Sequence, residues 1–238
     1  MGAPLVIGFD GDDTLWHSER YFVLTQERIM AELAPWVAAE RFEEALLATE
    51  RANLARFGYG VKGFLLSTIE TAISLTEARV PASLIHQIVQ WGKELLDHPV
   101  ELLPDVAPIL EDLSAQHRLV LITKGDLFHQ EAKVAGSGLA DRFDAVHIVA
   151  EKHVRDYERV LASVGVAPSD FVMVGNSLRS DIVPAAELGG RAVHVPYHVT
   201  WALEEAEVPE VLADRVTRID RMGELPAVLD QLRGAGQP

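Results

Sequence analysis

Short apolar runs recur along the chain, and each one ends in polar or small residues. The runs are rich in Val, Ile or Phe and show little alternation between apolar and polar positions. This pattern predicts strands that are buried on both faces of a parallel sheet. The runs cover residues 5–9, 119–123, 145–149, 171–174 and 192–195.

Helical patterns separate the last four of these runs. Between residues 106 and 116, for example, Val106, Ile109, Leu110 and Leu113 follow a helical spacing. Strands that alternate with helices predict an α/β fold, a Rossmann-like doubly wound parallel sheet with right-handed crossovers. After residue 200 we expect one more short strand near Val216 and a helix over 224–232.

The long interval between the first two runs breaks this alternation, because it contains helical stripes and no convincing strand. One stripe steps through Phe42, Ala45, Leu46, Thr49 and Asn53, and a second through Leu84, Ile85, Ile88, Val89, Leu95 and Leu96. We therefore expect residues 17–100 to form an inserted all-helical cap domain. Residues 1–16 and 101–238 would form the α/β core, and the proline-bearing stretch 97–104 would lead back to it.

Two features near these boundaries have two readings each. The glycine-spaced loop 58–63 either aims Tyr59 or Lys62 at a substrate or simply joins two helices, and the second reading is favoured. Trp16 and His17 follow the first run closely and have two readings. Either both line the mouth of a site, or Trp16 packs against the helical insertion and His17 faces solvent. The spacing of Trp36 and Trp91 suits core-facing helix positions.

Composition narrows the function classes. The chain has 238 residues, no cysteine and a formal charge of −15. Disulfides, thiol nucleophiles and Cys-ligated zinc are thus excluded, and the charge opposes nucleic acids and anionic membranes as partners. No apolar run approaches the roughly 18 residues of a membrane span. Residues 1–9 lack Lys and Arg and run into Asp10, so we expect no signal peptide. Because the chain has no cysteine, we expect the reducing cytoplasm as its location.

Candidate chemistry lies directly after the predicted strands. In open α/β sheets, ligands bind outside the carboxyl ends of the strands. Clustered carboxylates at that edge repel one another, and Mg²⁺ prefers one or two carboxylates together with water and phosphate oxygens. The side chains that follow the strands are Asp10 and Asp12, Thr123 and Lys124, Lys152, and Asn176 and Asp181.

These residues carry a resemblance to a known family. Asp10-x-Asp12-x-Thr14-Leu15, Thr123, Lys152 and Gly175-Asn176-Ser177 through Asp181 resemble the four motifs of the haloacid dehalogenase (HAD) superfamily, in order. Each motif stands at the end of an expected strand, and the insertion stands where phosphatase-type members carry a helical type-1 cap. The chain is therefore identified as similar to that superfamily over nearly its whole length.

The resemblance implies a role for each motif residue. Asp10 is the implied nucleophile, and Asp12 is the implied general acid and then base, a task that calls for a raised pKa. Thr123 and the Lys124 amide, at a helix start, would bind the phosphoryl group. Lys152 would align the nucleophile and the phosphate oxygens.

The resemblance also implies a metal site. Mg²⁺ would lie among Asp10, the Asp12 carbonyl, Asp181 and Asn176. Many members carry Asp where Asn176 stands, so we expect weaker Mg²⁺ binding from the neutral amide. Gly11 and Asp13 also depart from the commonest pattern, and Asp13 is expected to stabilise the turn.

The function implied is Mg²⁺-dependent hydrolysis of the phosphomonoester of a small metabolite, through a phosphoaspartate on Asp10. A 2-haloacid dehalogenase of the same superfamily is an alternative, although a halide leaving group would need no acid at Asp12. A phosphomutase and a non-catalytic phosphate-binding regulatory module are further alternatives. The sequence does not specify the substrate or the oligomeric state.

Overall fold

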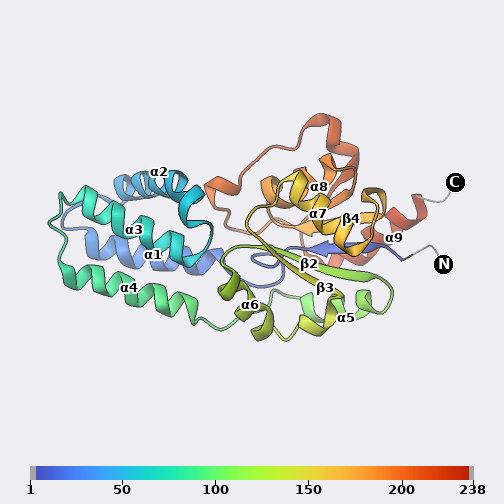
Figure 1. Cartoon of the computed structure of the whole chain (residues 1–238), viewed down its shortest axis with the longest axis horizontal. Coiled ribbons are helices and arrows are strands. Elements are labelled where there is room, and N and C mark those ends of the chain that lie inside the picture. Colours follow the sequence, from blue (N-terminus) through green and yellow to red (C-terminus); the bar gives the residue numbers. More distant parts are fainter. Residues whose placement is uncertain (1–3, 236–238) are drawn as a thin grey trace. The chain divides into compact units, whose positions relative to one another are not determined.

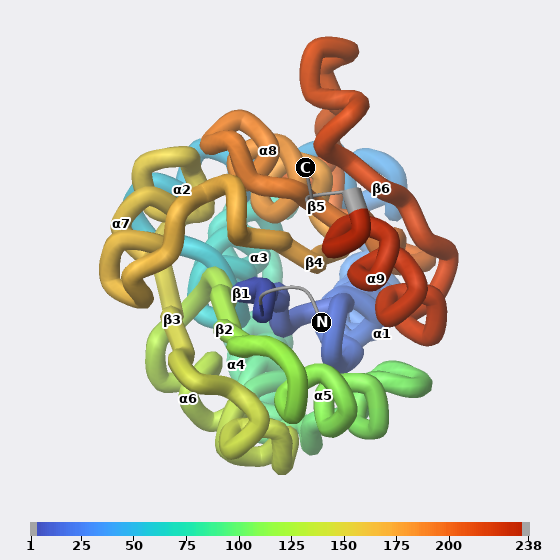
Figure 2. Tube along the Cα trace, turned by 90° about the vertical axis from the view of Figure 1, so that its right-hand side faces the viewer, coloured from blue at the N-terminus to red at the C-terminus, as the bar shows by residue number. Residues whose placement is uncertain are grey.

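Six parallel strands form one sheet in the computed structural model, which describes residues 4–235. The order across the sheet is β3-β2-β1-β4-β5-β6, with β1 between β2 and β4 (Figure 2). The strands are β1 (Val6–Phe9), β2 (Arg118–Lys124), β3 (Ala145–Val149), β4 (Phe171–Gly175), β5 (Arg191–His194) and β6 (Val216–Arg218). The predicted doubly wound sheet is thus confirmed; residues 1–3 and 236–238 of the expected core range lie outside the described residues.

Both faces of the sheet are buried at the central strands β1, β2 and β4, which explains the continuous apolar runs there. Helices α5 (Val106–Ser114) and α9 (Leu225–Ala235) pack with Ile7 and Phe9 on one face. Helices α7 (Val154–Val164) and α8 (Val183–Glu187) pack with Val6 and Val120 on the other. Neighbouring residues of β1 and β2 therefore point into opposite cores, as the two-residue period of a strand requires.

The strand order places the candidate chemistry at one edge. From β1 the chain runs outward through β2 and β3 and then returns to β4 on the other side of β1. This reversal is the topological switch point, where open α/β sheets bind ligands beyond the carboxyl ends of their strands. The loops after β1, β2 and β4 all leave the sheet at that edge, because the strands are parallel.

The chain divides into two compact units (Figure 1). The α/β unit holds the sheet and comprises residues up to 17, residues 100–124 and residues from 130 onward. The helical unit comprises residues 18–99 and 125–129. Helix α6 (Leu127–Gly136) therefore begins in one unit and continues in the other.

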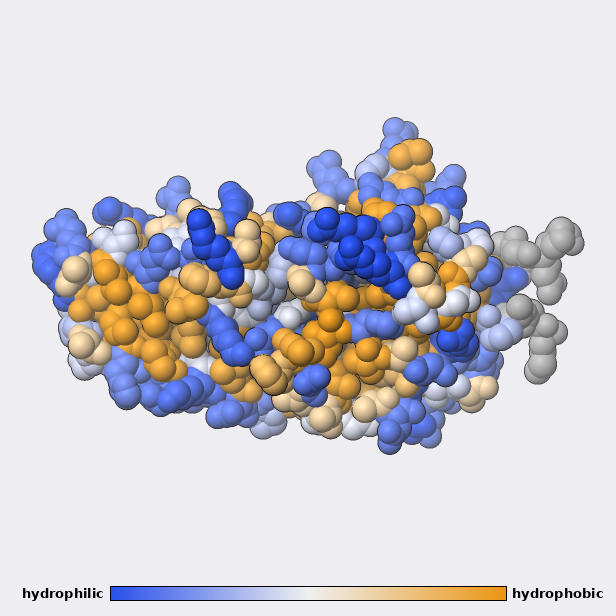
Figure 3. Space-filling model, viewed as in Figure 1, coloured by the Kyte–Doolittle hydropathy of each residue, from blue (hydrophilic) through white to orange (hydrophobic). Residues whose placement is uncertain are grey.

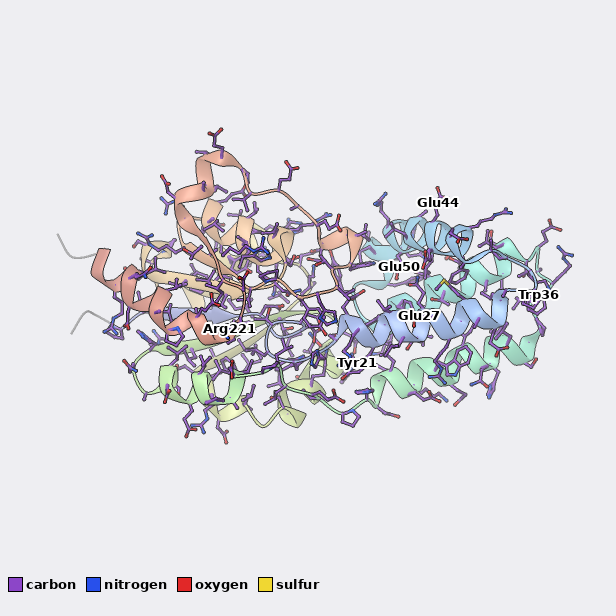
Figure 4. All side chains as sticks on the ribbon, turned by 180° about the vertical axis from the view of Figure 1, so that it is seen from behind. Tyr21, Glu27, Trp36, Glu44, Glu50 and Arg221 are labelled. Carbon is purple, nitrogen blue, oxygen red and sulfur yellow. The ribbon has the colours of Figure 1, made fainter. Side chains whose placement is uncertain are left out.

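Four helices with their own apolar core make up most of the helical unit. They are α1 (Glu19–Leu33), α2 (Ala39–Phe57), α3 (Val61–Leu75) and α4 (Ala82–Leu96). Ile29, Phe42, Phe64 and Ile88 contribute one core residue from each helix. Trp91 is buried as expected, but the prediction for Trp36 is wrong: it lies in the loop after α1 and is 39% exposed (Figure 4).

The glycine-spaced loop is the turn between α2 and α3. Gly58 and Gly60 have φ angles of 69° and 101°, which a side chain would disfavour. Lys62 Nζ lies 2.8 Å from Asp126 Oδ2 and 5.5 Å from the centre of the Phe128 ring. Lys62 is thus bound to the short segment that the helical unit takes from residues 125–129.

Helix α3 has apolar residues on more than one side. Leu66 and Ile73 are 47% and 42% exposed, while Val61 and Phe64 are buried. Figure 3 shows apolar atoms gathered on the surface of the helical unit. Within residues 4–235, no helix combines the length and the apolar character that crossing a membrane requires.

Candidate active site

The loop after β1 is a tight turn that brings two carboxylates to the sheet edge. The backbone amides of Thr14, Leu15 and Trp16 donate to the Gly11 carbonyl. A Cβ on Gly11 would lie 2.6 Å from the Trp16 ring, so the ring occupies the space that a larger residue would fill. Asp13 has a φ of 62°, a left-handed conformation that Asp tolerates better than most residues. The expected role of Asp13 in the turn has this physical basis.

Lys152 joins the carboxylates that follow β1 and β4. Its Nζ lies 2.5 Å from Asp10 Oδ1 and 2.7 Å from Asp181 Oδ1. The exposed fractions of the three side chains are 2% for Lys152, 10% for Asp10 and 0% for Asp181. One buried ammonium therefore neutralises part of a buried pair of carboxylates, an arrangement that is costly unless every charge has a partner.

Asp181 lies in an unusual turn after β4. The residues Leu178–Ile182 form a π-helical turn, a feature that is frequent at functional sites. The amide of Ser177 donates to Asp181 Oδ2 over 3.0 Å, and Tyr157 fixes the same turn through the carbonyl of Ser180. The carboxylate of Asp181 lies against Gly175, where a Cβ would overlap its oxygens.

A Gly175→Ala substitution is therefore expected to lower the free energy of unfolding by about 1–3 kcal/mol, because the buried carboxylate must move. Urea denaturation measures this change. Gly234→Ala is the matched control, since a Cβ there meets no atom within 4 Å and the position is helical. Equal stability of the Gly175→Ala and Gly234→Ala proteins would contradict the expectation.

Asp12 is held by three donors. Lys133 Nζ lies 2.6 Å from Oδ1 and 2.7 Å from Oδ2, Trp16 Nε1 donates to Oδ1 over 2.6 Å, and Gln130 Nε2 donates to Oδ2 over 3.1 Å. Burial alone raises the pKa of Asp12, but Lys133, Trp16 and Gln130 outweigh it and hold the pKa below its usual value. The raised pKa expected for Asp12 is thus not found.

The pKa of Asp10 is shifted upward, opposite to that of Asp12. Burial, followed by repulsion from Asp181, raises the pKa of Asp10 to about 7, and the attraction of Lys152 only partly opposes this. A nucleophilic carboxylate must be ionised, so a nearby cation would favour the reactive form of Asp10. The charges of Asp10, Asp12 and Asp181 against Lys133 and Lys152 sum to −3 + 2 = −1.

Thr123 is buried at the end of β2, and Gln130 Nε2 donates to its Oγ1 over 2.6 Å. Because that bond uses a lone pair of Oγ1, the hydrogen of the hydroxyl can point to another acceptor. A Cβ on Gly11 would lie 3.2 Å from Thr123 Oγ1, so the loop after β1 closely approaches Thr123. The structure thus brings Thr123 to the same edge as Asp10 and Asp12.

Lys124 does not have the environment expected for it. It is the last residue of β2, and α6 begins three residues later, so its amide is not at a helix start. Its Nζ lies 2.5 Å from Glu204 Oε1 and 2.8 Å from Ser180 Oγ. The positive charge of this side chain is therefore balanced by Glu204, a residue that no sequence pattern indicated.

Glu204 also ties the segment after β5 to the loop after β4. Its carboxylate accepts from Ser177 Oγ over 2.6 Å and from Ser180 Oγ over 2.5 Å. Arg179, which the motif also contains, donates to the Leu203 carbonyl. Burial raises the pKa of Glu204, but Lys124 and the two hydroxyls lower it overall, so the carboxylate is ionised here.

Asn176 lies beside oxygens of the first loop. In the orientation that satisfies both ends of the amide, its nitrogen donates to the Asp12 carbonyl over 3.1 Å and to Asp10 Oδ2 and Thr14 Oγ1 over 3.2 Å. The backbone carbonyl of Asn176 accepts from His194 Nε2. Three oxygens thus converge on one polar atom.

This donor set fits a hard divalent cation. Asp10 and Asp181 supply carboxylates, Asp12 supplies a carbonyl and Asn176 supplies an amide oxygen if its amide turns over, which matches the oxygen ligands that Mg²⁺ prefers. Within residues 4–235, no group of three His, Cys, Asp or Glu side chains forms a metal site by itself. Any cation here would depend on backbone and amide oxygens as well.

The structure brings Asp10, Asp12, Thr123, Lys152, Asn176 and Asp181 to one edge. The sequence reasoning missed Lys133, Gln130, Glu204 and the indole of Trp16. Gln130 and Lys133 stand three residues apart on the helix after β2, and that spacing was the one available signal for them. Trp16 is buried in the core with its nitrogen on Asp12, and His17 Nδ1 lies 2.6 Å from the Tyr197 hydroxyl.

Known proteins share this architecture. A family model described as a haloacid dehalogenase-like hydrolase matches residues 5–189. The crystal structure of a haloacid dehalogenase-like family hydrolase from Xanthomonas campestris is similar over 100% of both chains, with a TM-score of 0.86 and 40% identity.

Two curated phosphatases match part of the chain. N-acylneuraminate-9-phosphatase of Homo sapiens is 30% identical over 151 residues, 60% of this chain and 57% of that protein. Glyceraldehyde 3-phosphate phosphatase of Methanothermobacter thermautotrophicus is 32% identical over 132 residues, 53% of this chain and 58% of that protein. The chain thus matches less than two thirds of the length of either relative.

Proposed function

Since the chain belongs to the haloacid dehalogenase-like hydrolase family, we propose that it hydrolyses the phosphomonoester of a small metabolite through a phosphoaspartate on Asp10. The single observation that carries this proposal is the position of Lys152 Nζ, 2.5 Å from Asp10 and 2.7 Å from Asp181. Three motifs that lie far apart in sequence thereby share one charge centre. The names of the two phosphatase relatives support the same reaction class.

In the first step, an oxygen of the Asp10 carboxylate attacks phosphorus while the bond from phosphorus to the leaving oxygen breaks. Asp12 takes up a proton as the negative charge of the phosphate approaches it, and it gives that proton to the leaving oxygen, which departs as an alcohol. Lys152 and the Thr123 hydroxyl hold the phosphoryl oxygens and offset their charge. The product bound to the enzyme is an acyl phosphate on Asp10.

In the second step, water attacks the phosphorus of the phosphoaspartate. Asp12, now a carboxylate, takes a proton from that water as the bond between phosphorus and the Asp10 oxygen breaks. Inorganic phosphate leaves, and both side chains return to their starting protonation states. Splitting the reaction in this way replaces one difficult displacement by two easier ones.

We propose Mg²⁺ as the cofactor, held by Asp10, the Asp12 carbonyl, Asp181 and Asn176. When bound, Mg²⁺ would supply positive charge beside the phosphoryl oxygens. The residue charge of −1 from the three carboxylates and the two lysines would then become +1. A site of that charge is suited to a phosphate dianion.

Replacing Asn176 by Asp is expected to lower the Mg²⁺ concentration that gives half the maximal rate. The added carboxylate supplies a charged oxygen in place of a neutral amide. A titration of the rate against Mg²⁺ for both proteins measures the change. An unchanged or higher requirement in Asn176→Asp would show that this position does not face the metal.

We further propose that residues 17–100 act as the cap domain and that residues 1–16 and 101–238 form the catalytic core. The substrate class is a phosphorylated small metabolite, in keeping with the names of the two phosphatase relatives. A cysteine-free composition is compatible with a cytoplasmic place of action.

The test is turnover of p-nitrophenyl phosphate and of a panel of metabolite phosphates, with Mg²⁺ and with a chelator. Release of inorganic phosphate that requires both Mg²⁺ and Asp10 is the expected result. Metal-free release of halide from a 2-haloacid would instead indicate a dehalogenase, and phosphoryl transfer within a sugar phosphate would indicate a mutase. Phosphate binding without any turnover would indicate a regulatory module.

A further inference from the structure

We infer that Lys133 is a positioning residue that sets the direction of the Asp12 carboxylate for proton transfer. The inference rests on the proposed function, because it assigns a partner to the acid and base of that reaction. Lys133 belongs to none of the four motifs. It lies on α6, the helix that follows the strand of Thr123.

The contact between the two side chains is bidentate. Lys133 Nζ lies 2.6 Å from one oxygen of Asp12 and 2.7 Å from the other. Each oxygen also accepts one further hydrogen bond, Oδ1 from Trp16 and Oδ2 from Gln130. These four hydrogen bonds set the orientation of the carboxylate plane, and one of them must open when an oxygen of Asp12 takes up a proton.

Burial makes the contact between Lys133 and Asp12 costly in free energy, so a purely structural role does not explain it well. The side chain of Lys133 is 11% exposed and that of Asp12 is 27% exposed. Holding a lysine away from water carries a desolvation cost, and an apolar residue on α6 would avoid it. Asp12 is the more open partner, as a group that must reach a substrate should be.

Gln130 connects this arrangement to the phosphoryl site. Its Nε2 carries two hydrogens and lies within hydrogen-bonding distance of three acceptors: Asp12 Oδ2, Thr123 Oγ1 at 2.6 Å and the Lys124 carbonyl at 3.1 Å. Gln130 and Lys133, three residues apart, lie on the same face of α6. One helix face thus orients both the acid Asp12 and the phosphate-binding hydroxyl Thr123.

If Lys133 positions Asp12, replacing Lys133 should lower the rate of the first step by an amount that depends on the leaving group. An alkyl phosphate needs a proton on its leaving oxygen, whereas 2,4-dinitrophenyl phosphate releases a stable anion without one. Misdirecting Asp12 should therefore slow the first step only for the alkyl substrate. The second step uses Asp12 as base with either substrate and should slow for both.

The experiment compares Lys133→Met with the wild type on both substrates. For the best alkyl phosphate of the metabolite panel, we expect kcat to fall about 10²-fold or more, the scale of general acid catalysis, with little change in KM. For 2,4-dinitrophenyl phosphate, a rapid burst of dinitrophenolate equal to the enzyme concentration should precede a slow steady state. Lys133→Arg should recover part of the alkyl rate, because a guanidinium can also hold a carboxylate at two oxygens.

Two controls separate positioning from general damage. Lys93→Met removes the same charge from an exposed helix position of α4 and should match the wild type. Adding Lys133→Met to Asp12→Asn should cost little beyond Asp12→Asn alone, because residues that act as one unit are not additive. If Lys133→Met does not fold, the same substrate comparison is made with Lys133→Arg and Lys133→Gln.

An equal fall in the burst rate and in the alkyl rate would overturn the inference, as would wild-type rates with both substrates. Either result requires that the wild type turns over both substrates, and so it leaves the proposed function intact. A wild type that turns over neither, or an Asp10→Asn protein that keeps its burst, would instead refute the proposed function.

Discussion

An Asp10→Asn protein is expected to fold normally and to lose at least about four orders of magnitude in kcat, the scale seen when a nucleophile of a concerted catalytic group is removed. The amide has nearly the shape of the carboxylate but cannot form an acyl phosphate. Asp10 is buried with a pKa raised to about 7, so removing its charge relieves repulsion from Asp181. Lys152 keeps Asp181 as a partner.

Turnover of p-nitrophenyl phosphate and thermal unfolding together measure this result. Asp112→Asn is the matched control, because Asp112 is an exposed carboxylate on α5 in the same unit. We expect the melting temperatures of both variants to stay within about 4 °C of the wild type, which corresponds to roughly 1 kcal/mol for a chain of this size. More than about 1% of wild-type turnover in Asp10→Asn would exclude it as the nucleophile.

Lys152→Met is expected to lower the free energy of unfolding by about 3–5 kcal/mol and to abolish activity. Breaking a buried ion pair from one side leaves an uncompensated charge, and here two carboxylates would remain together. Such a loss is a large part of the roughly 5–15 kcal/mol that stabilises most domains. Urea denaturation of the metal-free protein measures the change.

The stability deficit of Lys152→Met relative to the wild type should shrink as the pH falls towards about 7, the pKa of Asp10 in the wild type. The pKa of Asp10 is already about 7 with Lys152 present, and removing that cation raises it further. Between about 7 and this further raised value, the folded variant holds a proton on Asp10 that the folded wild type has largely lost, whereas the two unfolded states bind protons alike. The stability of the variant therefore approaches that of the wild type as the pH falls through this range.

The double variant Asp10→Asn with Lys152→Met provides the check. It leaves one buried carboxylate, Asp181, in place of two, so it should be more stable than Lys152→Met alone. A loss below about 1 kcal/mol in Lys152→Met, or no recovery in the double variant, would mean that the buried pairing contributes little to folding.

Much of the fold was readable because β1, β2 and β4 are buried on both faces, and because the edge strand β3 is also a short apolar run although Val146 is 41% exposed. Each predicted run matches a strand to within one residue at either end, and Ala145–Val149 matches at both. In the helical interval, the stripes at 42–53 and 84–96 correspond to α2 and α4. The four helices of that interval share one core, yet α3 carries apolar residues on exposed positions too, which leaves it without a single clear stripe.

The motif residues of the site could also be predicted from the sequence, since each follows a strand that ends at the same edge. The charged partners that set their pKa values could not be predicted from it. The low pKa of Asp12 comes from Lys133, and the pairing of Lys124 comes from Glu204, which is 80 residues away in sequence. Such partners depend on where long side chains reach, and no periodicity or spacing encodes that.

The hydrogen bond from Trp16 to Asp12 gives this protein an optical property. Indole emission responds to a charge or proton change at its nitrogen, and this nitrogen donates directly to Asp12 Oδ1. Trp16 is 1% exposed and Trp91 6%, whereas Trp36 is 39% exposed, so an external quencher suppresses the emission of Trp36 before that of the two buried indoles. In a Trp91→Phe background, the emission that the quencher spares can therefore follow events at the proposed acid without any added dye.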